Sequence, residues 1–224
     1  TYDDAKFNGS IHTVIVIDGL DTSKIHTDAL TGAQIPMDGT EFAEFKGGQA
    51  VSAPVATPAP AVNKLTPASK GSIRHEFIAS DESGHQIIYV NETTGKTWAK
   101  PTPRLSRDLQ LIGGGKVMHT TLEGFREYKI ADGTMTREVK IPGAKNIFTC
   151  FRFVDGRTML IERTSGKGYF VGKDDKVIST FCIGKNDLRL ARPTKRGTLL
   201  VGGYGSVKEM TLNGQVLREW TWPN

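Results

Sequence analysis

Arginine and a few other polar residues recur just before the glycine-containing turns of successive repeat units in this sequence. These residues are Arg107, Asp108, Gln110, Arg152, Arg189 and Arg192. A guanidinium group offers a planar fork of donors that suits a carboxylate, a sulfate or an acidic sugar. We therefore predict a site for an anionic or polyhydroxylated ligand, in which Arg107, Arg152 and Arg192 line a common cavity. In the alternative interpretation the arginines are structural and pair with Asp108 and Asp187.

The residue pattern does not indicate metal binding, phosphate binding or nucleophilic catalysis. The five histidines, at positions 12, 26, 75, 85 and 119, are too dispersed for the usual spacing of metal ligands, so we predict no metal site. Gly113–Gly115 lacks the Lys-Ser/Thr of a phosphate-binding loop and is interpreted as a hairpin turn. No Gly-x-Ser-x-Gly nucleophile motif occurs. The sequence therefore leaves both a catalytic residue and a cofactor unknown.

The predicted site residues belong to a repeat of about forty residues, which is marked by Gly114, Gly156 and Gly197. Each glycine is followed by three short apolar runs, with a turn between the second and the third. The first runs are Lys116–His119, Thr158–Ile161 and Thr198–Val201. The second runs are Phe125–Ile130, Gly168–Val171 and Val207–Leu212. The turns are Asp132-Gly133, Asp174-Asp175 and Asn213-Gly214, and the third runs are Met135–Ile141, Val177–Ile183 and Val216–Trp222.

Short strands at regular spacing, with no helical period, predict an all-β protein. A period of about forty residues with three to four strands per unit is typical of a β-propeller. We count about four blades, over residues 73–103, 104–145, 146–186 and 187–224. The start of the innermost strand lies near the mouth of a propeller's central channel, so the predicted ligand site belongs at that mouth.

The chain before the repeats divides into two parts. Residues 49–70 are rich in proline and alanine and predict an extended linker, which is poorly packed around Pro54–Pro67. Residues 1–48 form a short N-terminal segment with one strong strand, His12–Ile17. That segment is interpreted as the tail of a larger domain or as a piece packed on the repeats, which themselves span residues 71–224. Since the first residue is Thr1, we expect a processed product, an excised fragment or a trimmed chain.

Composition and charge narrow the function classes. The net charge is +5, from 29 basic and 24 acidic residues that are interspersed, so we predict no nucleic-acid partner. No apolar run approaches the about 20 residues that cross a bilayer, so we predict no membrane span. Cys150 and Cys182 fall in predicted strands, where a buried free thiol is the expected state.

The strand and turn motifs carry a family resemblance. One unit reads Phe77–Asp81, Ile87–Asn91 and Thr94–Trp98, and the later units contribute Arg107–Leu111, Phe153–Leu160 and Gly197–Gly202. Over about 150 residues this pattern resembles bacterial β-propellers of the quinoprotein-like (PQQ-repeat-like) and NHL-like superfamilies. Quinone-binding blades usually carry a tryptophan docking motif in every blade. Here the second and third units have none, so the sequence does not predict a quinone cofactor.

The resemblance implies a fold that hosts binders, scaffolds and enzymes alike. We expect a ligand- or partner-binding scaffold in an exported bacterial protein, secreted or periplasmic, whose ligand is a carbohydrate or another small anionic molecule. The alternative is a carbohydrate-active or quinoprotein-like enzyme with its site at the propeller channel. Because four blades fall short of the usual number, we expect another chain, a continuation or self-association to complete the ring.

Overall fold

The structure is a computed structural model, which describes residues 11–23, 43–44, 73–185 and 187–221. Every regular element within these ranges is a β-strand, which confirms the predicted all-β class. No helix in the described ranges is long and apolar enough to span a bilayer. The linker at residues 49–70, together with His26 and Trp222, lies outside the described residues.

The described strands form four antiparallel sheets, which are the blades of a β-propeller. Blade one consists of β1 (Ile11–Val16), β3 (Glu76–Asp81), β4 (Gln86–Asn91) and β5 (Lys96–Pro101). Blade two consists of β6 (Leu109–Gly113), β7 (Lys116–Thr121), β8 (Gly124–Lys129) and β9 (Met135–Lys140). Blade three consists of β10 (Ile147–Arg152), β11 (Thr158–Glu162), β12 (Lys167–Val171) and β13 (Val177–Cys182), with the short β2 (Ala43–Glu44) on its outer edge. Blade four consists of β14 (Leu190–Pro193), β15 (Leu199–Gly202), β16 (Ser206–Met210) and β17 (Val216–Thr221).

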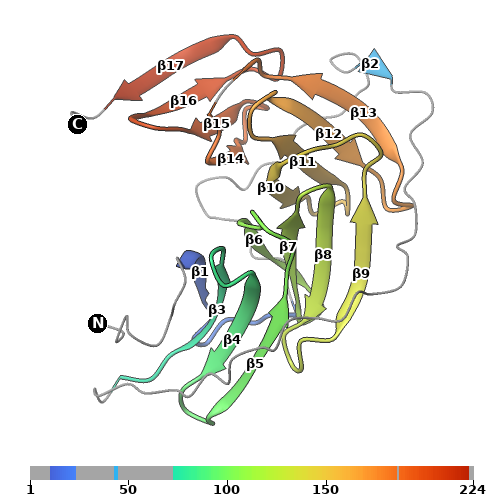
Figure 1. Ribbon diagram of the computed structural model, residues 1–224. Helices are drawn as coiled ribbons and strands as arrows, with labels where there is room; N and C mark the ends of the chain where they lie inside the picture. Colours follow the sequence, from blue (N-terminus) through green and yellow to red (C-terminus); the bar gives the residue numbers. More distant parts are fainter. Residues whose placement is uncertain (1–10, 24–42, 45–72, 186, 222–224) are drawn as a thin grey trace.

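The blades follow one another around an arc in chain order. The inner strands β1, β6, β10 and β14 contact each other in that sequence, and the remaining strands of each blade lie farther out. Figure 1 shows blade one at the lower left and blade four at the upper left, at the two ends of the arc. The four predicted units therefore correspond to the four observed blades.

Blade one takes its inner strand from the N-terminal segment. β1 pairs with β3, with Val14 opposite Ala79 and Val16 opposite Phe77. The unit predicted at residues 73–103 supplies three strands, and the strand predicted at His12–Ile17 supplies the fourth. The N-terminal segment and the repeats thus share a sheet, because a blade without an inner strand would leave the β3 edge unpaired.

The hydrophobic core lies between neighbouring blades. Met118, Phe125 and Val139 of blade two form one cluster with residues of blade three. Phe151 and Phe170 of blade three form another cluster with residues of blade four. All six residues of β10 are buried, because blade three is covered on both faces. Each fully buried large side chain contributes about 1.5–3 kcal/mol to stability.

The predicted turns occur where the sequence placed them. Gly133 and Gly214 have positive φ angles of 67° and 88°, which glycine adopts without steric cost. Asp175 occupies the matching turn of the third unit with a φ of 67°. Its carboxylate accepts a hydrogen bond from Arg137 of blade two, so this turn also ties two blades together.

Cys182 differs from the prediction of a buried thiol. Cys150 is buried in β10, whereas Cys182 is exposed. The difference arises because Cys182 ends the outer strand β13, where alternate residues face solvent. Both cysteines are free thiols.

Substituting Gly124 by alanine should destabilise the protein by about 1–3 kcal/mol, the usual cost of overpacking. A Cβ atom at Gly124 would collide with the carbonyl oxygen of Val139, a backbone atom of the paired strand β9. The measurement is urea unfolding. The control is Gly202→Ala, because a Cβ atom there has its nearest neighbour 3.7 Å away. Equal stability of the two variants would contradict this account of the blade.

Candidate functional site

The candidate site lies on the face of the propeller where the inner strands begin. Antiparallel pairing places the end of each second strand beside the start of the inner strand, as Ile147 beside Glu162 in blade three shows. Residues that precede β6 and β14 therefore lie on the same face as residues that follow β3, β11 and β15. This face brings together side chains that are far apart in the sequence.

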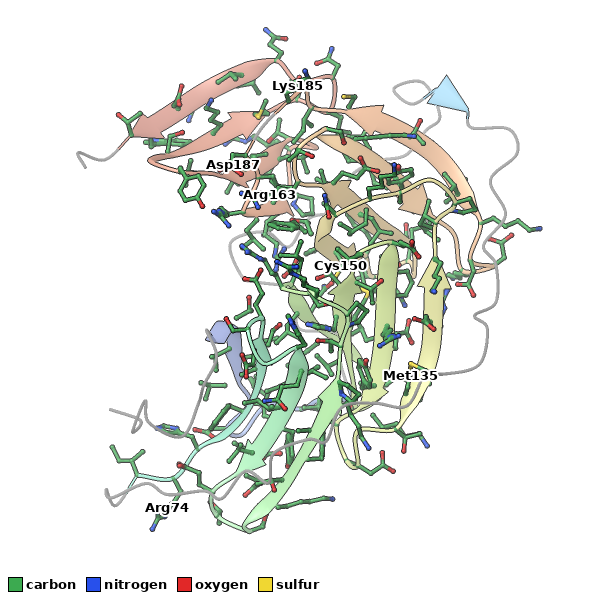
Figure 2. The ribbon with its side chains drawn as sticks, viewed as in Figure 1. Arg74, Met135, Cys150, Arg163, Lys185 and Asp187 are labelled. Atoms are coloured by element: carbon green, nitrogen blue, oxygen red, sulfur yellow. The ribbon has the colours of Figure 1, made fainter. Side chains whose placement is uncertain are left out.

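Three arginines from three blades gather on this face around aromatic rings. The guanidinium carbons of Arg107 and Arg163 lie 4.5 and 5.0 Å from the ring centroid of Phe148. The guanidinium carbon of Arg189 lies 4.0 Å from the ring centroid of Tyr204. Figure 2 shows Arg163 and Asp187 close together on the concave side of the arc. Cation–π contacts of this kind contribute about 0.5–2 kcal/mol each and hold the guanidinium groups in place.

Two of these arginines already have carboxylate partners. Arg107 donates from Nη2 to Glu82 Oε1 at 2.5 Å. Arg163 donates to Asp187 Oδ1 from Nε at 2.8 Å, and its Nη2 lies 2.7 Å from the same oxygen. Within the described residues, no carboxylate lies within 4.0 Å of the Arg189 guanidinium group. Burial, followed by the positive charges of Arg163 and Arg107, lowers the pKa of Arg189, so this group lies in a positive environment.

A small pocket adjoins the arginines on blade four. Its volume is about 120 Å³, well below the about 300–1,000 Å³ of a pocket for a drug-sized ligand. Its lining residues are Asp187, Leu188, Val201, Gly203, Tyr204, Ser206 and Lys208. Asp187 and Tyr204 belong to both the pocket and the arginine contacts, so the two features form one site.

Asp108 and Arg192 bind each other instead of facing an open cavity. Arg192 donates from Nη2 to Asp108 Oδ1 at 2.6 Å and from Nη1 to Oδ2 at 2.8 Å. Asp108 Oδ2 also accepts the backbone N–H of Cys150 at 3.0 Å. The Asp108 side chain is fully buried, and the pair joins blade two to blade four past the inner strand of blade three. This geometry favours the structural interpretation for both residues.

Gln110 and Arg152 also make contacts between blades. Gln110 bonds both the N–H and the C=O of Arg152, at 2.5 and 3.1 Å. The Arg152 guanidinium group donates to Glu127 at 2.8 Å and to Thr158 at 2.8 Å. These partners all lie in blades two and three. Of the predicted site residues, Arg107 and Arg189 thus belong to the group of three arginines at the candidate site. The others make contacts that hold the blades together, namely Asp108, Gln110, Arg152 and Arg192.

The sequence analysis did not single out Arg163, Phe148 or Glu82. Glu82 and Arg163 each follow the second strand of a blade, β3 and β11. Strand topology could have identified these positions, because antiparallel pairing puts the end of the second strand beside the start of the inner strand. Within the described part of the chain, no group of three or more His, Cys, Asp or Glu residues could hold a metal ion.

Comparison with known proteins supports the fold. No family model and no curated protein matches the chain. A catalytically inactive H270A virginiamycin B lyase from Staphylococcus aureus, solved with quinupristin, is 13% identical with a TM-score of 0.51, over 80% of this chain and 60% of the lyase. A streptogramin B lyase is 13% identical with a TM-score of 0.50, over 66% of this chain and 51% of that one.

A protein of unknown function from Bacteroides caccae is 16% identical with a TM-score of 0.48, over 68% of this chain and 60% of that one. The chain thus spans about half to three fifths of the length of these structures. The likeness to the two lyases, with TM-scores of 0.50 and 0.51, shows the fold, which places the chain in the class of β-propeller proteins. The quinoprotein-like and NHL-like resemblance stays a prediction.

Proposed function

We propose that this chain is a ligand-binding β-propeller scaffold whose site is the pocket on blade four together with the adjoining arginines. The ligand is a small polar or anionic molecule, such as a carbohydrate derivative. The observation that carries the proposal is the convergence of Arg107, Arg163 and Arg189 from three blades beside a concave surface. Placing cationic side chains close together costs energy because they repel each other, and an anionic ligand offsets this cost.

Tyr204 provides the test of this site. It is 69% exposed, so Tyr204→Ala should leave the fold intact while removing the ring under Arg189 and one wall of the pocket. Ligand-detected NMR on a mixture of neutral sugars, sugar acids and small carboxylates identifies a bound probe. We expect Tyr204→Ala to weaken its binding about tenfold, as for aromatic anchors at other binding sites. The control is Val154→Ala, an exposed position in a turn of blade three, and equal loss in both variants would contradict the proposed site.

The enzyme alternative would need a nucleophile that is hydrogen-bonded to a general base at this site. Asp187 and Ser206 line the pocket, but Asp187 pairs with Arg163, and among the described residues no hydrogen bond joins the Ser206 hydroxyl to a base. Within the described residues, Ser80 and His119 form a hydroxyl–imidazole pair with 2.9 Å between Oγ and Nε2. Both residues are fully buried between blades one and two, out of reach of a substrate. We therefore base the proposed function on binding.

Blade four has an outward face, which is the face turned away from blade three. On blade three the corresponding face carries Phe151 and Phe170, which are buried against blade four. On blade four, Leu190 and Trp220 share this face and are 38% and 47% exposed. Arg218 lies beside Glu209 on it, so two copies of the face would not repel each other strongly. We propose that a second copy of the chain packs on this face.

Self-association through this face should be concentration-dependent and should disappear in Trp220→Asp. The physical reason is that burying a carboxylate in an apolar contact is costly. Size-exclusion chromatography with light scattering measures the mass, and Val154→Asp is the control because that residue is 52% exposed elsewhere. A wild-type chain that stays monomeric up to submillimolar concentration would refute the proposal.

We also propose that the protein is exported, secreted or periplasmic. The support is compositional, since residues 49–70 resemble the alanine- and proline-rich tethers common in exported multidomain proteins. Fractionation of the cells that naturally produce the protein tests this. Its recovery in the cytoplasmic fraction would contradict export.

A further inference from the structure

The charge balance of the candidate site limits the ligands that fit it. Arg107, Arg163 and Arg189 bring three positive charges, and Glu82 and Asp187 bring two negative charges. Lys208 in the pocket lies 3.5 Å from Glu219, which balances it. The cluster therefore retains one positive charge in excess. A ligand with one negative charge neutralises it, whereas a dianion would leave a negative charge beside Glu82 and Asp187.

The position of Arg189 identifies the group that can anchor a ligand. Arg107 and Arg163 are engaged by carboxylates at 2.5 and 2.7–2.8 Å, while Arg189 is held by the face of the Tyr204 ring. Ring contact leaves the edge donors of a guanidinium fork available for a planar acceptor. The lowered pKa of Arg189, which follows from burial and from the two neighbouring arginines, means that a bound anion would be stabilised there.

The pocket beside Tyr204 limits the rest of the ligand. Leu188 and Val201 provide apolar walls, and Ser206 provides a hydroxyl group. A volume of about 120 Å³ accommodates a small hydroxy acid or one end of a sugar acid. Resting on the proposed ligand site, we infer that Arg189 anchors the carboxylate of a small hydroxylated monocarboxylic acid, of the sugar-acid or hydroxy-acid class, whose stem lies in the blade-four pocket.

The experiment is isothermal titration calorimetry of the full chain at fixed ionic strength. The probes are D-galacturonate, lactate, D-galactose and D-galactose 6-phosphate. We expect galacturonate to bind at least about tenfold more tightly than galactose, because charged hydrogen bonds exceed neutral ones in strength. Arg189→Gln should weaken galacturonate binding about 10- to 100-fold and leave any galactose binding unchanged. Arg189→Lys keeps the charge but loses the fork, so it should restore affinity only in part.

The matched control is Arg157→Gln. Like Arg189, Arg157 contacts the face of an aromatic ring, Phe153 at 5.8 Å. Unlike Arg189, it pairs with a carboxylate, Asp155, and it lies in the turn at the opposite end of β10. Its substitution should leave galacturonate affinity unchanged. Higher ionic strength should weaken galacturonate binding in the wild type and much less in Arg189→Gln.

Several outcomes would overturn the inference. Tighter binding of galactose 6-phosphate than of galacturonate would show that the site prefers a dianion. Equal binding of galactose and galacturonate would remove the carboxylate anchor but leave the proposed ligand site standing. Binding of neither galacturonate nor lactate would also overturn it. The proposed function is tested separately, and it fails if no probe binds or if Tyr204→Ala and Val154→Ala lose binding equally.

Discussion

Replacing Asp108 by alanine is expected to lower the free energy of unfolding by about 3–5 kcal/mol, the cost of breaking a buried ion pair from one side. The Asp108 side chain is fully buried, and both of its oxygens accept hydrogen bonds from Arg192. Its loss leaves Arg192, which is 19% exposed, without its carboxylate. It also leaves the N–H of Cys150, on a fully buried residue, without its acceptor. Blade two then loses this direct link to blade four.

The measurement is urea unfolding of Asp108→Ala, Arg192→Ala and the double variant. Arg192→Ala should lower the free energy of unfolding by a similar amount, because it removes the ion-pair partner of the buried Asp108 carboxylate. The double variant should cost clearly less than the two single changes together, since the second removal abolishes the unpaired charge that the first created. The control is Arg157→Ala, because its partner Asp155 is 46% exposed whereas Asp108 is fully buried, so the Arg157–Asp155 pair should be worth about 0–1 kcal/mol. Strictly additive costs would show that the two side chains do not act as a pair.

Acid should destabilise the protein through His119. Burial, and to a smaller degree the charge of Arg126, lowers the pKa of His119 to about 3 from an ordinary value of 6.5. Ser80 donates its hydroxyl proton to the carbonyl of Ser106 at 2.9 Å, so Nε2 of a neutral His119 donates to Ser80 Oγ. Nδ1 then has no hydrogen-bond partner among the described residues, and a proton placed there would be buried and unpaired.

The sign of the effect follows from proton binding. Below about pH 6.5 the unfolded chain protonates this histidine, whereas the folded protein does not do so until about pH 3. Stability should therefore fall by about 1.4 kcal/mol for each pH unit between these values, and His119 should contribute no slope above pH 6.5. The test compares wild type with His119→Gln, whose side-chain amide can still donate to Ser80. The variant should lose this slope between pH 6.5 and 5, where few carboxylates titrate; an unchanged slope would contradict the burial of a neutral imidazole.

Hydrogen bonds between inner strands add to the apolar packing that holds the blades together. Asp108 and Gln110 bond the main chain of β10, and Thr149 Oγ1 accepts the N–H of Ala191 at 2.9 Å. Each of these bonds joins residues 42 positions apart in the sequence. A polar side chain at the inner strand thus satisfies a buried backbone group of the next blade. This role accounts for much of the polar recurrence that the sequence analysis assigned to a ligand site.

The sequence by itself determined the repeating architecture. Turn glycines at a spacing of about forty residues, alternating apolar runs and the Asp-Gly and Asn-Gly turns gave the all-β class, four units and most strand positions. These signals are local, because a positive φ angle or a period of two acts within a few residues. Local signals also predicted the position of β1. They could not predict its pairing with β3, since residues 49–70 separate the N-terminal segment from the repeats.

Only the tertiary structure decided which polar residues meet. Asp108 and Arg192 are separated by 84 positions and pair because the arc brings blades two and four together at its centre. Arg163 joins Arg107 on the ring of Phe148 because the end of β11 lies beside the start of β10, while the curvature of the arc brings up the loop before β6. The recurrence of arginine in the sequence could not separate Arg189, which meets a ring and a pocket, from Arg152, which meets Glu127. The physical reason is that a guanidinium group serves a ligand or a neighbouring carboxylate equally well, and the packing of the blades decides which of them lies within reach.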